Sequence, residues 1–113
     1  MKKIIILVLI LISLTGCSPK RSTSEIIKEI MSSKEYIIID VRTKEEYNMS
    51  HIKNAINIPY DKINKNIDID KDNVIFVYCA SGKRSSIAFN KLEKLGYTVY
   101  DLGAFASINL PKE

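Results

Sequence analysis

Four short stretches of this chain have the apolar pattern of β-strands. Residues 36–39 and 74–78 are continuous runs of β-branched and aromatic side chains, which are typical of strands buried on both faces of a parallel sheet. Residues 55–58 alternate in polarity before a proline, and residues 98–100 follow a glycine. Both have the length and composition of a strand, so four strands are predicted.

The segments between these strands have helical spacing. Residues 22–25 have the spacing of a capping box, and the apolar face that follows predicts a helix over 24–32. Residues 43–46 repeat the capping box ahead of a short helix. After residues 74–78, apolar positions spaced by four and three residues predict a helix that is capped by Ser85 or Ser86 and stops at Gly96.

Strands that alternate with helices predict an α/β fold of three layers, in which helices flank both faces of a central, mostly parallel sheet. In such sheets ligands bind beyond the carboxyl ends of the strands. Cys79 lies at one such end, and Asp40 and Arg42 lie at another. For Asp40 and Arg42 a structural pairing is favoured, with support of the site as the alternative. His51, the only histidine, is expected to hold a turn rather than act as a general base.

The N-terminus has the order of a bacterial lipoprotein signal. Two lysines precede an apolar core at residues 4–14, which fits a signal peptide of ~7–15 apolar residues and is short of the ~20 that span a bilayer. Leu14-Thr15-Gly16-Cys17 resembles the box read by lipoprotein-processing enzymes. We therefore expect a signal peptide at 1–16, lipid on Cys17, a tether at 17–23 and a domain at 24–113. An ordinary secretory signal is the alternative.

These boundaries leave one thiol without a partner. If Cys17 carries lipid, Cys79 has no internal cysteine to pair with, and an unpaired thiol in an exported protein requires an explanation. Cys79 lies between a predicted strand and a helix N-terminus, and Lys83 and Arg84 follow it closely. Backbone N–H groups, the helix dipole and both cations lower a thiol pKa from its usual ~8.5, which predicts a nucleophile. A small buried hydrophobe is the alternative.

Composition narrows the classes of function. Without residues 1–16 the chain keeps 97 of its 113 residues, enough for one domain, and its charge falls from +4 to +2 as Lys2 and Lys3 are removed. Nucleic acid is not expected as a partner, because the chain has neither a basic run nor an aromatic stacking platform. Neither a metal site nor a cofactor is expected.

Four motifs in register make the chain similar to the single-domain rhodaneses. They are Ile38-Ile39-Asp40-Val41-Arg42, Glu46-Tyr47, His51-Ile52-Lys53-Asn54-Ala55-Ile56-Asn57-Ile58-Pro59 and Cys79-Ala80-Ser81-Gly82-Lys83-Arg84-Ser85, within residues 35–111. The resemblance implies a sulfurtransferase in which Cys79 cycles between thiol and persulfide. The donor would be thiosulfate or a similar sulfane compound, and the acceptor a thiol, cyanide or a protein.

The backbone N–H groups of Ala80, Ser81, Gly82, Lys83, Arg84 and Ser85 would surround the persulfide. Arg84 could bind substrate or clamp a carboxylate such as Asp40. A persulfide carrier with little turnover is a second possible function. A phosphatase is less favoured, because that class places five residues between cysteine and arginine and this chain has four. The segment 102–108 lacks the family's usual tryptophan, so the acceptor preference is expected to differ.

Overall fold

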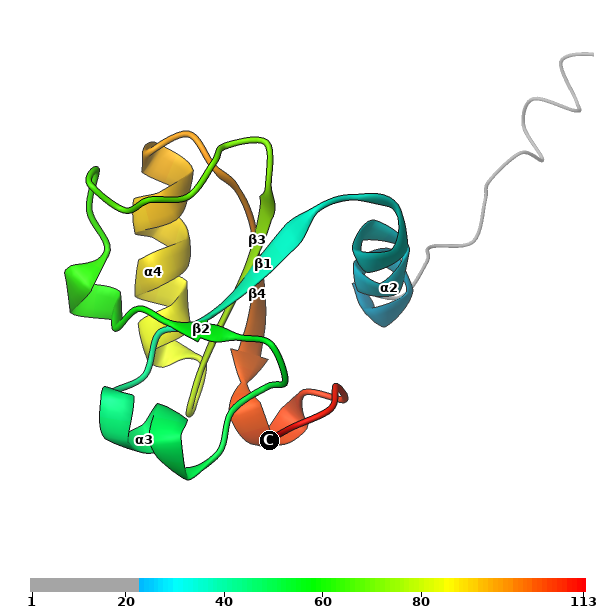
Figure 1. Cartoon of the computed structure of the whole chain (residues 1–113), viewed down its shortest axis with the longest axis vertical. Coiled ribbons are helices and arrows are strands. Elements are labelled where there is room, and N and C mark those ends of the chain that lie inside the picture. Colours follow the sequence, from blue (N-terminus) through cyan, green and yellow to red (C-terminus); the bar gives the residue numbers. More distant parts are fainter. Residues whose placement is uncertain (1–22) are drawn as a thin grey trace, which may run out of the picture.

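The computed structural model describes residues 23–113, and the predicted signal peptide and Cys17 lie outside them. Each strand is followed by a helix or a 3-10 turn (Figure 1). In chain order the elements are α2 (Thr23–Ser33), β1 (Tyr36–Asp40), α3 (Lys44–Met49), β2 (Ile56–Asn57), the 3-10 turn η1 (Tyr60–Lys62), β3 (Val74–Cys79), α4 (Lys83–Lys94), β4 (Thr98–Ala104) and the 3-10 turn η2 (Phe105–Ser107).

The strands form one parallel sheet in the order β2-β1-β3-β4. All six residues of β3 are buried, as its continuous apolar run predicts. In the register of β1 and β3, Asp40 lies beside Tyr78. The carboxyl ends of these two strands are therefore neighbours, and the segments that follow Asp40 and Cys79 leave the sheet side by side.

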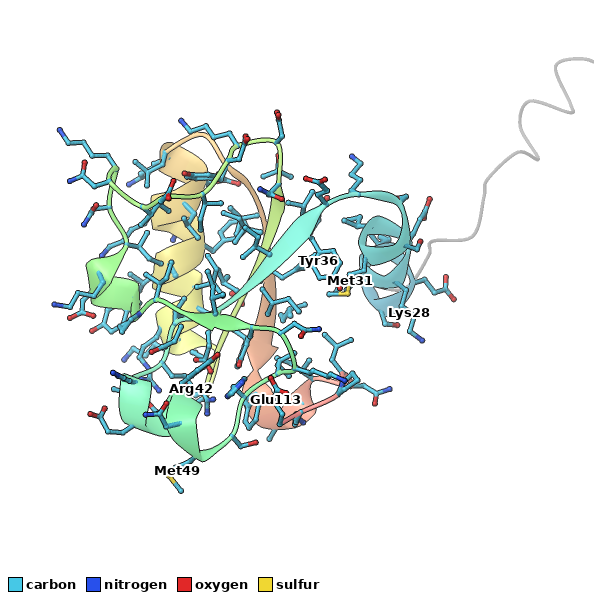
Figure 2. The ribbon with its side chains drawn as sticks, in the orientation of Figure 1. Lys28, Met31, Tyr36, Arg42, Met49 and Glu113 are labelled. Carbon is cyan, nitrogen blue, oxygen red and sulfur yellow. The ribbon has the colours of Figure 1, made fainter. Side chains whose placement is uncertain are left out.

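Helices cover both faces of the sheet, which confirms the predicted three-layer fold (Figure 1). On one face, Ala88 and Leu92 of α4 pack with Ile39, Val77 and Cys79. On the other face, α2 packs with Phe76 and Tyr78 through its apolar residues, and Met31 points toward Tyr36 and the sheet whereas Lys28 points away (Figure 2). Each strand of the centre thus lies between two apolar layers, which removes its side chains from water.

The start of α4 differs from the sequence prediction. The N-cap is Gly82, with φ of +94°, and the helix begins at Lys83 rather than after Ser85 or Ser86. A glycine adopts this left-handed conformation without the steric cost of a Cβ, so the chain turns into the helix directly after the cysteine. Ser85 is consequently buried in the first turn, where its hydroxyl donates to the Gly82 carbonyl at 3.0 Å.

Strand β4 is longer than predicted because a bulge lets it continue to Ala104. The register with β3 shifts between Val77 and Tyr78, which pairs Tyr78 with Gly103 and Cys79 with Ala104. Gly103 has φ of +82°, and its N–H donates to the Asp101 carboxylate at 2.9 Å. The bulge places backbone, rather than a large side chain, beside the segment that follows Cys79. No helix within residues 23–113 is long and apolar enough to cross a membrane.

Candidate active site

Cys79 ends β3, and its sulfur is held by the turn that follows. The side chain is fully buried, and Sγ accepts a 2.9 Å hydrogen bond from the Gly82 N–H. Ser85 Oγ lies 3.5 Å from Sγ on the other side of the turn. We call residues 79–85 the cysteine loop. Its geometry wraps donor groups around one sulfur atom, which is the arrangement expected for a stabilised thiolate.

The contacts in the cysteine loop change the acidity of the thiol. Burial alone raises the pKa of Cys79, but hydrogen bonds from the Ser85 side chain and from the backbone of Ser85, Gly82 and Ser81 outweigh it. The net result is a pKa below the ordinary value of a cysteine. Lowering the pKa populates the thiolate, which is the nucleophilic form of the residue.

Position 82 requires glycine because of its backbone angle, and not because a side chain would be crowded there. A Cβ at this position would lie 3.8 Å from Gly103 Cα, an ordinary contact distance, but φ of +94° is strained for any other L-residue. The bulge of β4 therefore lies against the cysteine loop without filling the space of a side chain at Gly82. The left-handed conformation of Gly82 brings its N–H to the sulfur.

Arg84 forms a bidentate ion pair with a residue of α3. Its Nη1 donates to Glu46 Oε1 at 2.7 Å, and its Nη2 donates to Glu46 Oε2 at 3.0 Å. The pKa of Arg84 is raised chiefly by this hydrogen bond, with a further contribution from the charge of Cys79. Arg84 therefore clamps a carboxylate, as one of its two predicted roles requires. The partner is Glu46 and not Asp40.

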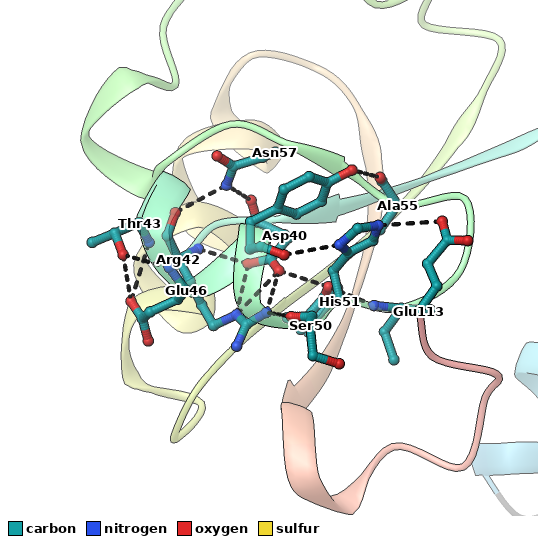
Figure 3. Close-up of polar contacts among 12 residues, drawn as sticks. Asp40, Arg42, Thr43, Glu46, Ser50, His51, Ala55, Asn57 and Glu113 are labelled. Atoms are coloured by element: carbon teal, nitrogen blue, oxygen red, sulfur yellow. Dashed lines mark hydrogen bonds and ion pairs between the residues drawn. The ribbon is translucent and has the colours of Figure 1, made fainter.

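Glu46 is fixed by α3 as well as by Arg84. Thr43 and Glu46 form the predicted capping box, in which the Glu46 N–H donates to Thr43 Oγ1 at 3.2 Å and the Thr43 N–H donates to Glu46 Oε1 at 3.1 Å (Figure 3). The hydrogen bond from Arg84 is the largest influence on the Glu46 carboxyl and, with those from Thr43, lowers its pKa from 4.5 to about 2 despite partial burial. Glu46 is accordingly ionised at neutral pH.

Asp40 and Arg42 form a separate buried pair (Figure 3). Arg42 donates to both carboxylate oxygens of Asp40, with the shortest contact from Nη2 at 2.7 Å, and the same nitrogen donates to the Ser50 carbonyl at 2.6 Å. Tyr78 donates its hydroxyl to Asp40 Oδ2 at 2.7 Å, and its pKa is raised chiefly by burial and further by this contact. This network joins the ends of β1 and β3, in agreement with the structural pairing favoured for Asp40 and Arg42.

His51 also has structural contacts. Its Nδ1 donates to the Tyr47 carbonyl at 2.9 Å, and its ring stacks on Tyr47 with 3.8 Å between centroids. Its Nε2 lies 3.2 Å from Glu113 Oε1 (Figure 3). Both ring nitrogens are used to hold the segment after α3, which agrees with the turn-holding role expected of this residue.

Sequence reasoning missed the contacts that two residues, Phe105 and Glu46, make near the site. The Phe105 ring lies under the Arg42 guanidinium, with 4.3 Å from its centroid to Cζ, and it stacks on Tyr78 at 5.7 Å. Glu46 belonged to a recognised motif, but its pairing with Arg84 spans 38 positions. Phe105 lies in the segment 102–108, so an aromatic ring is present in this wall although the chain has no tryptophan.

A groove lies elsewhere on the molecule, away from the cysteine. It has a volume of about 240 Å³ and is lined by Ile27, Leu102, Ile108 and Leu110, among others, on the face of the sheet opposite Cys79. The chemistry of the cysteine loop places the candidate site at Cys79 rather than in this groove. Among residues 23–113, no group of three or more His, Cys, Asp or Glu side chains could hold a metal ion.

The fold and the site define a class of protein in which a parallel α/β sheet ends, at its central strand, in a cysteine whose pKa the following loop lowers. The family model described as "Rhodanese-like domain" matches residues 23–108. The chain belongs to the rhodanese-like family, and its resemblance to single-domain rhodaneses is confirmed.

Two named relatives differ in the share of their own length that this chain covers. The "Thiosulfate sulfurtransferase PspE" of Escherichia coli is 38% identical over 78 residues, which cover 66% of this chain and 75% of the relative. A "Probable molybdopterin-synthase adenylyltransferase" of Porphyra purpurea is 41% identical over 71 residues, which cover 60% of this chain and 19% of that protein. The chain thus spans about a fifth of the larger relative.

Solved structures agree with the fold. A rhodanese from E. coli, determined with anions, has a TM-score of 0.64 and 35% identity, covering 69% of this chain and 96% of that one. A rhodanese-like domain protein from Staphylococcus aureus has a TM-score of 0.63 and 34% identity, covering 75% of this chain and 85% of that one. Together these relatives support a sulfurtransferase or sulfur-carrier function for the family.

Proposed function

We propose that this protein is a sulfurtransferase that moves a sulfane sulfur from thiosulfate, or a similar donor, to a thiophilic acceptor through a Cys79 persulfide. The observation that carries the proposal is the donor arrangement around Cys79, where the Gly82 N–H lies 2.9 Å from Sγ and Ser85 Oγ lies 3.5 Å from it. The named thiosulfate sulfurtransferase of E. coli among the relatives supports the choice of donor.

The chemistry has two balanced steps. The Cys79 thiolate attacks the outer sulfur of thiosulfate, the bond between the two thiosulfate sulfurs breaks, and sulfite leaves with the electron pair. The outer sulfur remains on Cys79 as a persulfide anion. A cyanide, thiol or protein acceptor then attacks that sulfur, and the sulfur–sulfur bond to Cys79 breaks to restore the thiolate. A fixed array of N–H donors stabilises both anions without reorganising.

The positive groups at the start of α4 would attract the anionic donor. Lys83 is exposed at its first residue, and the helix N-terminus adds the positive end of its dipole. Arg84 is occupied by Glu46, and the carboxylate of Glu46 balances its charge. The cysteine loop therefore favours the thiolate and an approaching anion with the same set of positive groups.

Mass spectrometry and a cyanide assay test the proposal. After incubation with thiosulfate, the peptide that contains Cys79 should carry one added sulfur, and cyanide should then be converted to thiocyanate. Cys79→Ser should lose both activities, whereas Ser86→Ala, at an exposed neighbouring position, should keep them. No added sulfur and no thiocyanate above the Cys79→Ser background would refute the proposal.

A persulfide carrier is the second candidate, because one relative is named a sulfur carrier. The "Putative sulfur carrier protein YrkF" of Bacillus subtilis is 30% identical over 80 residues, which cover 70% of this chain and 43% of that protein. A carrier would acquire the Cys79 persulfide and pass it to a specific protein while thiocyanate formation stayed at background. The two measurements above therefore separate the candidates.

We also propose that the protein is exported and anchored by lipid on Cys17 to the extracytoplasmic face of the cell membrane. The support is the sequence of residues 1–17, with its lysines, apolar core and Leu14-Thr15-Gly16-Cys17 box. Cys17→Ala should move the protein from the membrane fraction to the soluble fraction of cells. Unchanged partitioning, or retention of residues 1–16 in the mature protein, would overturn the anchor.

A further inference from the structure

Arg84, the arginine of the cysteine loop, is paired with a residue of α3 and is therefore not available to bind an anion at the site. Both terminal nitrogens of Arg84 donate to Glu46, one to each carboxylate oxygen, at 2.7 and 3.0 Å. The two side chains are only partly exposed, at 28% and 33%. A guanidinium that faces one carboxylate with both nitrogens has committed the fork that would otherwise bind an oxyanion.

Glu46 does not depend on Arg84 for its position. The N–H and Oγ1 of Thr43 both donate to Glu46 Oε1 at 3.1 Å. These bonds close the first turn of α3, which follows β1 directly. The carboxylate is thus held by a backbone segment outside the cysteine loop, so Arg84 meets an anchored partner rather than a mobile one.

The pairing changes which anions the loop can hold. A tetrahedral oxyanion is bound tightly when an arginine fork donates to two of its oxygens, and a lysine offers only a point charge in place of that fork. Of the two loop cations, Lys83 is exposed and Arg84 is bound to Glu46. An oxyanion that enters must compete with an anchored carboxylate for the Arg84 fork.

We propose that Glu46 is a specificity-determining residue, which keeps the cysteine loop from binding a tetrahedral oxyanion tightly by occupying the guanidinium of Arg84. The inference deepens the proposed sulfur transfer and rests on it. Thiosulfate then reacts through its outer sulfur, and sulfite leaves without a guanidinium to retain it. The same pairing makes phosphate a poor ligand, in addition to the short spacing between Cys79 and Arg84.

Glu46→Gln removes the charge while leaving the capping pattern, because glutamine also serves at this position of a capping box. Glu45→Gln is the matched control, since Glu45 is exposed, lies in the same helix and undergoes the same change of charge. The double variant Glu46→Gln with Arg84→Gln removes the guanidinium that the proposal requires. All variants are made in the full chain.

The readout is protection of Cys79 from iodoacetamide by inorganic phosphate, followed on the Cys79 peptide by mass spectrometry. Sodium chloride keeps the ionic strength constant at fixed pH. Glu46→Gln should reach half-protection at about tenfold lower phosphate than wild type or Glu45→Gln, the scale of one charged hydrogen bond. The double variant should lose this gain. Equal protection in Glu46→Gln and Glu45→Gln, or a gain that persists in the double variant, overturns the proposal.

Arg84→Lys in the otherwise unchanged protein keeps the positive charge beside Glu46 but removes the planar guanidinium, and it gives a second test, which holds even if Glu46→Gln fails to fold. Because Glu46 already withholds Arg84, this variant should need the same phosphate concentration as wild type for half-protection. A tenfold increase would show that Arg84 binds the anion in the wild type, and the proposal would fail. Neither test uses sulfur transfer, so it is independent of the thiocyanate and persulfide results.

Discussion

Ser85→Ala isolates the side-chain contribution to the acidity of Cys79. Ser85 Oγ lies 3.5 Å from the sulfur and also donates to the Gly82 carbonyl at 3.0 Å. When Cys79 ionises, the sulfur becomes the better acceptor for this hydroxyl. A hydrogen bond to a charged group contributes about 1.5–3 kcal/mol, and the long contact and the competing carbonyl place Ser85 at the lower end. Losing about 1.5 kcal/mol of thiolate stabilisation raises the pKa of Cys79 and leaves about tenfold less thiolate at a pH below the pKa.

The assay is the pH dependence of Cys79 alkylation by iodoacetamide, resolved by mass spectrometry. Because the wild-type pKa is lowered, its alkylation rate reaches a plateau at lower pH than in Ser85→Ala. Below both pKa values the variant should react about tenfold more slowly, and above both the rates should converge. The Gly82 N–H remains in place in the variant, so the sulfur keeps that donor.

Ser86→Ala is the matched control for this measurement. Ser86 is exposed, and its backbone N–H donates to the Gly82 carbonyl at 3.2 Å, so alanine keeps that bond and changes no contact to the sulfur. Its profile should match the wild type. A Ser85→Ala profile that coincides with wild type, or one that moves to lower pH, would refute the reasoning that Ser85 stabilises the thiolate.

Three further variants test the surroundings of the loop. Gly82→Ala should lower the free energy of unfolding by roughly 1–2 kcal/mol in urea and slow Cys79 alkylation, because φ is +94°; unchanged values would contradict this. Tyr78→Phe removes a hydroxyl that donates to Asp40 and accepts from the Ile52 N–H, so the free energy of unfolding in urea should fall by about 1–3 kcal/mol, and no change would exclude the network as a source of stability. For Glu46, folding lowers the pKa to about 2, so its stabilisation is present above about pH 4.5 and is lost toward pH 2. The difference in unfolding free energy between wild type and Glu46→Gln is about 1 kcal/mol after allowance for solvent screening, and it should fall to zero over that range. A constant difference would contradict this assignment.

The fold was predictable because the apolar patterns are local and consistent. Continuous burial identifies β3 within one residue of its end, and the capping box at Thr43 marks the start of α3. The position of Cys79 at a strand end follows from the same pattern. The start of α4 was not predictable in this way, because serine is a preferred N-cap and the choice of Gly82 depends on the backbone angle that the sulfur contact needs.

The partners within the site required the structure, because they join residues that are distant in sequence. Two acidic residues near the carboxyl end of β1, Asp40 and Glu46, could pair with Arg84. The register of β1 with β3 decides between them, because it buries Asp40 against Tyr78. Asp40 pairs instead with Arg42, which follows it by two residues in the sequence. Glu46 is therefore the carboxylate that pairs with Arg84, and the capping box of α3 holds it in place. The short sequence motifs therefore specify which residues reach the sheet edge, whereas strand register and competition for carboxylates determine which carboxylate each arginine binds.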